Sequence, residues 1–246
     1  MGNTKIEYLD KTWNFYTGCR NWQNGVCPVG EKCWAKAIDK RFSRSFEPQF
    51  HADKMLEPLS VIKPSRIGVC FTGDLFGDWV DPNQKVETPC VGTDPMPCTL
   101  RQSVFYPMWL RQQHKYFFLT KCPNNYQKWG KFHEYMWLGS SVCNTKMMAQ
   151  TFNGFANAEA KNFWISFEPL MERIPMNQFP LKGKDFNVSW VVIGGWSQGK
   201  RQPNIEWIKE IVDACDKSNI RVFIKNNLKP ILPEITCRHL RQEFPL

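Results

Sequence analysis

The sequence predicts an α/β protein, with one parallel sheet folded as a single partial or complete (β/α) barrel. Short, almost continuously apolar runs rich in β-branched and aromatic residues recur along the chain, which is typical of strands buried on both faces of a parallel sheet. Segments with helical periodicity lie between these runs. The chain has 246 residues, close to the roughly 250 residues of a common (β/α) barrel. We therefore expect one domain over residues 1–246.

Seven apolar runs are predicted to form the strands of this sheet. In chain order they are residues 11–17, 66–72, 115–120, 136–142, 163–167, 190–194 and 220–224. A helix is expected to begin near Trp34, and residues 205–215 carry apolar side chains at helical spacing. Right-handed connections place the carboxyl ends of parallel strands at one edge of the sheet. Functional residues are expected at that edge.

Residues 81–100 interrupt the alternation of strands and helices. They contain four prolines and no helical period, so they are predicted to form a long ordered loop inserted after the second strand. Loops of this length are often functional. Cys90 and Cys98 lie in this segment and are candidates for a second metal site, although no histidine or CxxC pair accompanies them.

Composition excludes several classes of protein. Hydrophobic residues make up 42% and charged residues 22% of the chain, which is incompatible with wholesale disorder. No apolar run is long enough to span a bilayer, and the amino terminus has no apolar segment typical of a secretory signal. We expect a cytoplasmic protein with no membrane partner. The ten cysteines should then be reduced thiols, for which metal or cluster ligation is a better explanation than disulfides.

The net charge indicates an anionic partner. Lys and Arg number 32 against 23 Asp and Glu, which gives a net charge of +9. A positive surplus attracts phosphates and suits DNA, RNA or a nucleotide, and the segment from Lys36 to Arg44 is particularly rich in basic residues. The alternative is a solvated basic surface that binds nothing.

Three cysteines form the strongest motif of the sequence. Cys19, Cys27 and Cys33 fall within fifteen residues, in a glycine-containing segment between the first predicted strand and the helix near Trp34. Thiolates are the natural ligands of iron–sulfur clusters, and a loop allows three of them to converge. Two alternatives remain open: a zinc site completed by a distant Cys or His, and three unrelated buried cysteines.

A series of short segments recurs in a fixed order along the chain. It begins with Trp13-Asn14, Thr17-Gly18-Cys19 and Cys33-Trp34-Ala35. It continues through Phe50-His51, Glu57-Pro58-Leu59, Lys63-Pro64-Ser65-Arg66, Gly73-Asp74-Leu75-Phe76-Gly77-Asp78-Trp79, Leu119-Thr120-Lys121, Trp137-Leu138-Gly139, Ser166-Phe167-Glu168-Pro169-Leu170, Val192-Ile193-Gly194-Gly195 and Phe223-Ile224-Lys225. In these segments the sequence resembles a short phage- and archaeal-type branch of the radical S-adenosylmethionine superfamily. Two features depart from the superfamily. The cysteine spacing is C-x7-C-x5-C instead of C-x3-C-x2-C, and residues 81–100 resemble an insertion.

The resemblance implies a [4Fe–4S] cluster held by Cys19, Cys27 and Cys33, with S-adenosylmethionine bound to the fourth iron. One electron, from a donor such as flavodoxin or ferredoxin, would cleave the cofactor to a 5′-deoxyadenosyl radical that abstracts hydrogen from the substrate. The cofactor carries this chemistry, and the protein positions the radical and excludes water.

Further candidate residues follow the predicted strands. Gly73 and Asp74 follow the second strand, where related enzymes place a glycine-containing segment near the methionine end of the cofactor. Asp74 would bind the cofactor's ammonium group or cap the following helix. Lys121, Glu168 and Lys225 also lie at predicted strand ends. Glu168 would bind a cofactor hydroxyl or the substrate, and a lysine would hold a carboxylate or phosphate group. The alternative for each residue is an ion pair that closes the barrel mouth.

Two glycines and two cysteines complete the candidate set. Gly194 and Gly195 would allow the backbone to approach the cofactor, or form a tight turn. Cys122 and Cys143 would donate hydrogen to a substrate radical, or are inert buried thiols.

The sequence therefore predicts a radical enzyme that modifies or repairs a nucleic acid or nucleotide. Two alternatives are a radical enzyme acting on a small metabolite or peptide, and a zinc-stabilised nucleic-acid-binding module without catalysis.

Overall fold

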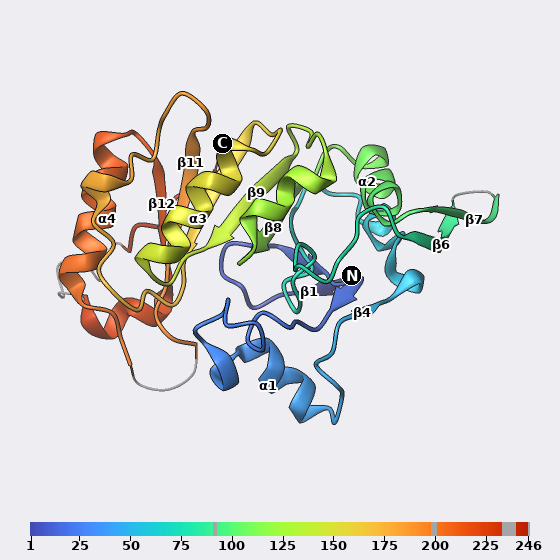
Figure 1. The fold of residues 1–246 in the computed structure, drawn as a ribbon, viewed down its shortest axis with the longest axis horizontal. Helices are drawn as coiled ribbons and strands as arrows, with labels where there is room; N and C mark the ends of the chain where they lie inside the picture. Colours follow the sequence, from blue (N-terminus) through green and yellow to red (C-terminus); the bar gives the residue numbers. More distant parts are fainter. Residues whose placement is uncertain (91–92, 198–200, 233–239, 246) are drawn as a thin grey trace.

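A central sheet of eight strands organises the protein (Figure 1). The computed structural model describes residues 1–90, 93–197, 201–232 and 240–245. In spatial order the strands are β1 (Gly2–Asn3), β2 (Lys11–Trp13), β5 (Arg66–Val69), β8 (Lys115–Thr120), β9 (Met136–Ser141), β10 (Asn162–Phe167), β11 (Val188–Ile193) and β12 (Arg221–Ile224). Strand β1 is antiparallel to β2, and each later pair is parallel. The predicted parallel α/β sheet is confirmed.

Each of the seven predicted runs contributes a strand to this sheet. The run at residues 11–17 divides: β2 joins the main sheet, and β3 (Tyr16–Thr17) pairs with β4 (Gln49–Phe50) in a separate antiparallel ladder. Within the described part of the chain no ladder joins β1 to β12. The sheet is therefore open there, and these residues do not form a complete barrel.

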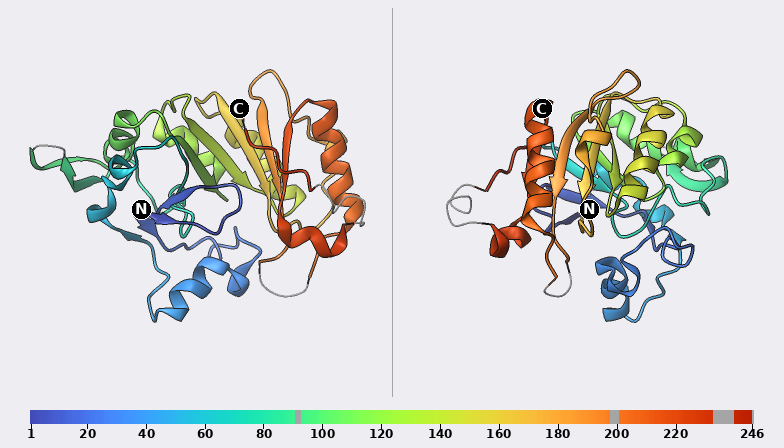
Figure 2. Two further views of the ribbon diagram at one scale, coloured as in Figure 1. Left: turned by 180° about the vertical axis from the view of Figure 1, so that it is seen from behind. Right: turned by 60° about the vertical axis from the view of Figure 1, so that its left-hand side comes forward.

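Helices connect neighbouring strands and cover one face of the sheet (Figure 2). They are α2 (Leu100–Leu110), α3 (Thr145–Ala156) and α4 (Ile205–Lys217). Helix α1 (Trp34–Arg41) begins where the sequence predicts and lies beyond the edge of the sheet in Figure 1. Short segments of 3₁₀ helix occupy Gly30–Lys32, Ala52–Lys54, Glu57–Ser60, Pro123–Trp129, Met176–Gln178 and Asn226–Ile231. No helix in the described residues is long and apolar enough to cross a membrane.

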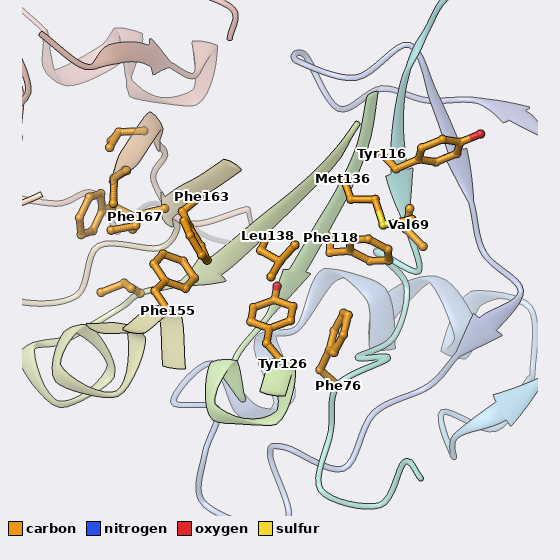
Figure 3. Packing of buried hydrophobic residues seen from close by; sticks show 14 of the residues in the cluster. Val69, Phe76, Tyr116, Phe118, Tyr126, Met136, Leu138, Phe155, Phe163 and Phe167 are labelled. Atoms are coloured by element: carbon orange, nitrogen blue, oxygen red, sulfur yellow. The ribbon is translucent and has the colours of Figure 1, made fainter. Parts of the chain in front are cut away.

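Hydrophobic clusters bury both faces of the sheet. Because side chains alternate along a strand, Tyr116 and Phe118 of β8 pack beneath the helices, and Phe117 packs on the opposite face. Figure 3 shows the helical side, where Phe76, Tyr126 and Phe155 meet the strands. The opposite cluster contains Tyr8, Leu9, Phe117, Trp137, Trp164, Trp190, Val192 and Phe223. Burial on both faces explains why the strand sequences are almost continuously apolar.

Two paired strands occupy most of residues 81–100, so the prediction of a long loop was wrong. Strands β6 (Lys85–Cys90) and β7 (Thr93–Thr99) are antiparallel, with Lys85 opposite Thr99. The hairpin projects from the body of the molecule in Figure 1. Prolines are tolerated where a strand's N–H group needs no partner, as on the outer edges of a two-stranded ladder. These prolines concealed the strand pattern.

We expect Gly139→Ala to destabilise the protein by about 2 kcal/mol, because overpacking forces neighbouring groups apart. The Trp164 indole lies over Gly139, and its Nε1 donates to the Phe118 carbonyl oxygen at 3.1 Å. A Cβ at residue 139 would meet the indole and lie 2.5 Å from that carbonyl. Urea unfolding measures the change. Gly183→Ala is the matched control, because the nearest atom to its Cβ would be 3.9 Å away; equal effects of the two substitutions would contradict the argument.

Candidate functional site

A cavity of about 760 Å³ lies at the carboxyl ends of the parallel strands, where ligands bind in open α/β sheets. It is on the face opposite the helices, since Tyr8 and Leu119 of the aromatic side line it. The structure brings eight of the predicted site residues to its wall: Cys19, Cys27, Cys33, Gly73, Asp74, Lys121, Glu168 and Lys225. They come from five separate stretches of the sequence, which the sheet gathers at one edge.

The cysteine loop begins in close contact with the end of β5. The Gly18 amide donates to the Thr72 carbonyl oxygen at 3.1 Å, and Gly18 also forms a parallel bridge with Gly73. A Cβ on Gly73 would lie 2.7 Å from the Gly18 carbonyl oxygen, so only glycine permits this approach. The Cys19 amide donates to the Phe46 carbonyl oxygen at 3.1 Å. Cys19 is thus held from two sides.

Asp74 connects this loop to the sheet. Its buried carboxylate accepts hydrogen bonds from the Asn21 side-chain amide at 2.6 Å and the Thr120 hydroxyl at 2.7 Å, and from the backbone amides of Phe76 and Lys121, both at 3.1 Å. Burial raises the pKa of Asp74, and these four donors oppose that rise. The carboxylate therefore connects the cysteine loop to strand β8 through hydrogen bonds. Its predicted contact with a cofactor ammonium group stays a prediction.

The three loop cysteines suit soft metals as a donor set. All cysteines whose side chains are described are free thiols, and Cys19, Cys27 and Cys33 each line the cavity while being half-buried. Burial raises the pKa of Cys19 to about 12, and Asp74 adds to this effect. Among the described residues no three Cys, His, Asp or Glu side chains stand close enough to enclose a metal ion. The chemistry of the donors fits an iron–sulfur cluster, but the loop would have to draw the thiols together.

Lys121 supplies a fixed positive charge beside the thiols. Its Nζ donates to the Ser141 hydroxyl at 2.9 Å. Burial by itself lowers the pKa of Lys121, but the acidic groups around it, first Cys143 and Cys27, outweigh burial and raise the pKa. In its protonated form Lys121 places positive charge in the cavity wall, which favours an anionic ligand or thiolates.

Glu168 and Lys225 form an ion pair in the cavity wall. Both side chains are largely buried, each with 15% exposure. Gly194 makes room for the pair, since a Cβ there would lie 3.0 Å from both side chains. Gly195 does not line the cavity and instead exchanges hydrogen bonds with the Asn227 side chain. The structure thus contains an ion pair between two of these residues, which the sequence left as an alternative.

Cys122 and Cys143 are buried beside the cavity and do not line it. The Cys122 thiol donates to the Asn21 side-chain oxygen at 3.2 Å, and the Cys143 thiol lies 3.9 Å from the Glu168 carbonyl oxygen. Burial raises the pKa of both thiols, that of Cys143 to about 11. Both stay protonated at neutral pH. Their suggested role as hydrogen donors stays a prediction.

The proposed second metal site receives no support from Cys98. Its Sγ lies 2.9 Å from the Ser103 hydroxyl and 3.3 Å from the Thr88 hydroxyl, and it lines a separate cavity of about 430 Å³ against α2. The side chain of Cys90 lies outside the described residues. The Cys98 thiol thus contacts hydroxyl groups and not the thiols or imidazoles that a metal site would need. These contacts indicate a role in packing and hydrogen bonding.

Sequence reasoning missed two hydroxyl groups of the main cavity. The side-chain oxygens of Thr72 and Ser166 are buried and have no hydrogen-bond partner within the described residues, and both residues line the cavity. Buried polar groups are normally paired, so two unpartnered hydroxyl groups in the lining of one cavity suit a polar ligand. A signal existed for Ser166, since a hydroxyl follows Trp164 on the same face of an otherwise apolar strand.

We expect Asn21→Ala to cost about 1–3 kcal/mol of stability, because it removes one donor from the buried Asp74 carboxylate. Urea unfolding measures this loss, and faster amide exchange in residues 19–33 should accompany it. Asn153→Ala is the control, since that amide pairs with Asn124 at the exposed surface and should change stability by under about 0.5 kcal/mol. An Asn21→Ala protein with unchanged stability and exchange would show that the anchor is dispensable.

One comparison with known proteins gives a match. Neither a curated protein nor a solved structure matches the chain. The family model described as "Protein of unknown function (DUF5131)" matches residues 3–229. That range includes every cavity residue named above, from Cys19 to Lys225. Because the match extends over most of its length, the chain belongs to the DUF5131 family.

Proposed function

We propose that the protein is a radical S-adenosylmethionine enzyme whose Cys19, Cys27 and Cys33 hold a [4Fe–4S] cluster. The observation that carries the proposal is the convergence of these thiols on one cavity at the carboxyl edge of a parallel sheet. When bound and reduced, the cluster would supply one electron to S-adenosylmethionine and so generate a carbon radical. The substrate is anionic, and a nucleic acid or nucleotide agrees best with the net charge of +9.

The arrangement of the sheet supports a partial (β/α) barrel. The strands of the main sheet from β2 to β12 have the same order in space as in the chain. Each connection therefore leads to the next strand in the same direction across the sheet. The residues of α2, α3 and α4 share one hydrophobic cluster with the strands. The opposite face is filled by aromatic side chains at one end and opens into the cavity at the other. A partial barrel has this construction.

The chain's own residues would orient and protect the reactants. Lys121 and Lys225 offer positive charge to carboxylate or phosphate groups, and the orphan hydroxyls of Thr72 and Ser166 offer hydrogen bonds. Tyr8 and Phe71 close the cavity on its aromatic side. An apolar wall of this kind limits the access of water and stray reductants to a radical.

An electron donor such as flavodoxin or ferredoxin is the partner that this chemistry requires. The turn between Cys19 and Cys27 is largely exposed, with Gln23, Asn24 and Gly25 at the surface. A donor would approach the thiols from this side without crossing the protein core.

Two other functions use the same residues. A radical enzyme acting on a small metabolite or peptide would leave the basic surface without a role. A zinc-stabilised nucleic-acid-binding module would need a fourth ligand, and among the described residues no histidine lines the cavity. Measured iron and acid-labile sulfide separate the cluster from zinc.

We expect Cys19→Ala, Cys27→Ala or Cys33→Ala to abolish iron binding in anaerobically reconstituted protein, because each change removes a thiolate ligand. Iron, sulfide and visible absorption are measured. Cys215→Ala is the control, since this buried thiol lies on α4, away from the cavity, and should keep the full iron content. Full iron and sulfide in the Cys27→Ala protein would refute the ligand assignment.

Reduced, reconstituted protein should convert S-adenosylmethionine to 5′-deoxyadenosine and methionine without its substrate, because reductive cleavage precedes substrate chemistry in the proposed reaction. Liquid chromatography with mass detection measures both products after addition of dithionite. The Cys27→Ala protein should release neither. A complete cluster that yields no 5′-deoxyadenosine would indicate a protein that keeps the cavity without this activity.

A further inference from the structure

The mouth of the cavity is formed by two segments distant in sequence. The first segment contains Lys32, which ends the 3₁₀ turn before α1, and Trp34, the first residue of α1. The second segment follows β11 and contains Trp196. The Lys32 Nζ lies 5.5 Å from the centroid of the Trp196 ring, so the two segments meet across the opening. Figures 1 and 2 show the chain after β11 descending beside the segment that precedes α1.

Unpaired positive charges surround this mouth. Lys5 and Lys32 line the cavity, and the Arg201 guanidinium lies 5.8 Å from the Trp196 ring centroid. Within the described ranges none of these three makes an ion pair, whereas Arg20 and Arg44 pair with nearby carboxylates. Cations without protein partners at the rim of a cavity are available to phosphate groups.

Aromatic surface is exposed at the same place. Trp34 lines the cavity, and its 36% exposure is high for so large an apolar side chain. Trp196, on the other segment of the mouth, also lines the cavity. Aromatic faces combined with cations are the features by which proteins bind unpaired bases, since every base can stack on a ring.

We infer that the mouth binds one unpaired base of a single-stranded polynucleotide, with Trp34 as the stacking surface and Lys32 and Arg201 beside the phosphates. This inference rests on the proposed function for the identity of the reaction site. A base within a duplex is stacked on its neighbours and would have to leave the helix to stack on the Trp34 ring. A single strand presents such a base without this cost.

The basic surface continues beyond the mouth, which favours a strand over a free nucleotide. Lys40 and Arg41 are exposed on α1, six and seven residues after Trp34. At 1.5 Å per residue this separation is roughly 10 Å along the helix. Neither residue makes an ion pair in the part of the chain that the structure describes. Neighbouring phosphates of a continuing strand would reach these cations.

The test is the binding of short fluorescein-labelled single-stranded DNA, single-stranded RNA and duplex DNA to the reconstituted protein, followed by anisotropy. We expect tighter binding of a single strand than of duplex. Trp34→Ala should weaken single-strand binding about tenfold through the loss of stacking, and Trp34→Phe should retain most of the affinity. Trp109→Ala is the matched control, because Trp109 is exposed on α2, far from the mouth in sequence, and lines the other cavity.

A second pair of variants tests the charges independently of Trp34. Lys40→Glu combined with Arg41→Glu should weaken binding of every strand and reduce its salt dependence. Lys146→Glu, on the exposed side of α3, should have no effect. The tighter of the DNA and RNA complexes identifies the sugar of the strand.

The outcomes separate this inference from the proposed function. Duplex bound as tightly as single strands, or equal losses from Trp34→Ala and Trp109→Ala, would overturn the inference, and so would tight binding of a free nucleotide with no gain from a longer strand. Iron content and 5′-deoxyadenosine formation are measured on the same samples. If those two signals are present without single-strand binding, only the inference fails. If binding depends on Trp34 and iron is absent, only the proposed cluster fails.

Discussion

The candidate site depends on one buried carboxylate. Asp74 joins the cysteine loop to the sheet through the Asn21 amide on one side and the Thr120 hydroxyl on the other. Without it, the loop would be connected to the strands mainly through the backbone contact of Gly18 with Thr72. An ionisable group in this position is costly to bury alone, and four donors satisfy it. The placement of the thiols over the strand ends therefore depends on this hydrogen-bonded centre.

The position of the cavity is a consequence of how the sheet is buried. On the face opposite the helices, Trp137 and Trp164 fill the space over the middle of β9 and β10, and smaller Ser141 and Ser166 occupy the same face at the carboxyl ends. The change from large apolar to small polar side chains leaves open volume at that edge. A fully aromatic face would have no cavity, and a fully polar one would lack a core.

The charged side chains of the cavity fall into two groups, one in its wall and one at its mouth. Lys121 and the Glu168–Lys225 pair lie in its wall, each held by a protein partner. The cations at the mouth have no ion-pair partner among the described residues, and two of them, Lys32 and Arg201, lie near the Trp196 ring. The lysines of the wall are held by protein partners, whereas the cations of the mouth are available to a ligand. This arrangement suits a ligand whose anionic backbone stays at the mouth while a less charged group enters the cavity. Membership of the DUF5131 family leaves this chemistry to be tested by experiment, and the site offers defined residues for it.

The amino-acid sequence alone determined the parallel strands, the start of α1 at Trp34 and the cysteine loop before it, because these features are carried by periodicity and spacing over a few residues. Tertiary structure decided the rest. The hairpin of residues 85–99 was hidden by prolines that a two-stranded edge tolerates. The bonds of Asp74 to Asn21 and Thr120, and the pairing of Glu168 with Lys225, join residues 46 to 57 positions apart. The order of the strands in the sheet decides which strand ends lie together and therefore which residues form these pairs. A pattern over a few residues of sequence does not contain this information.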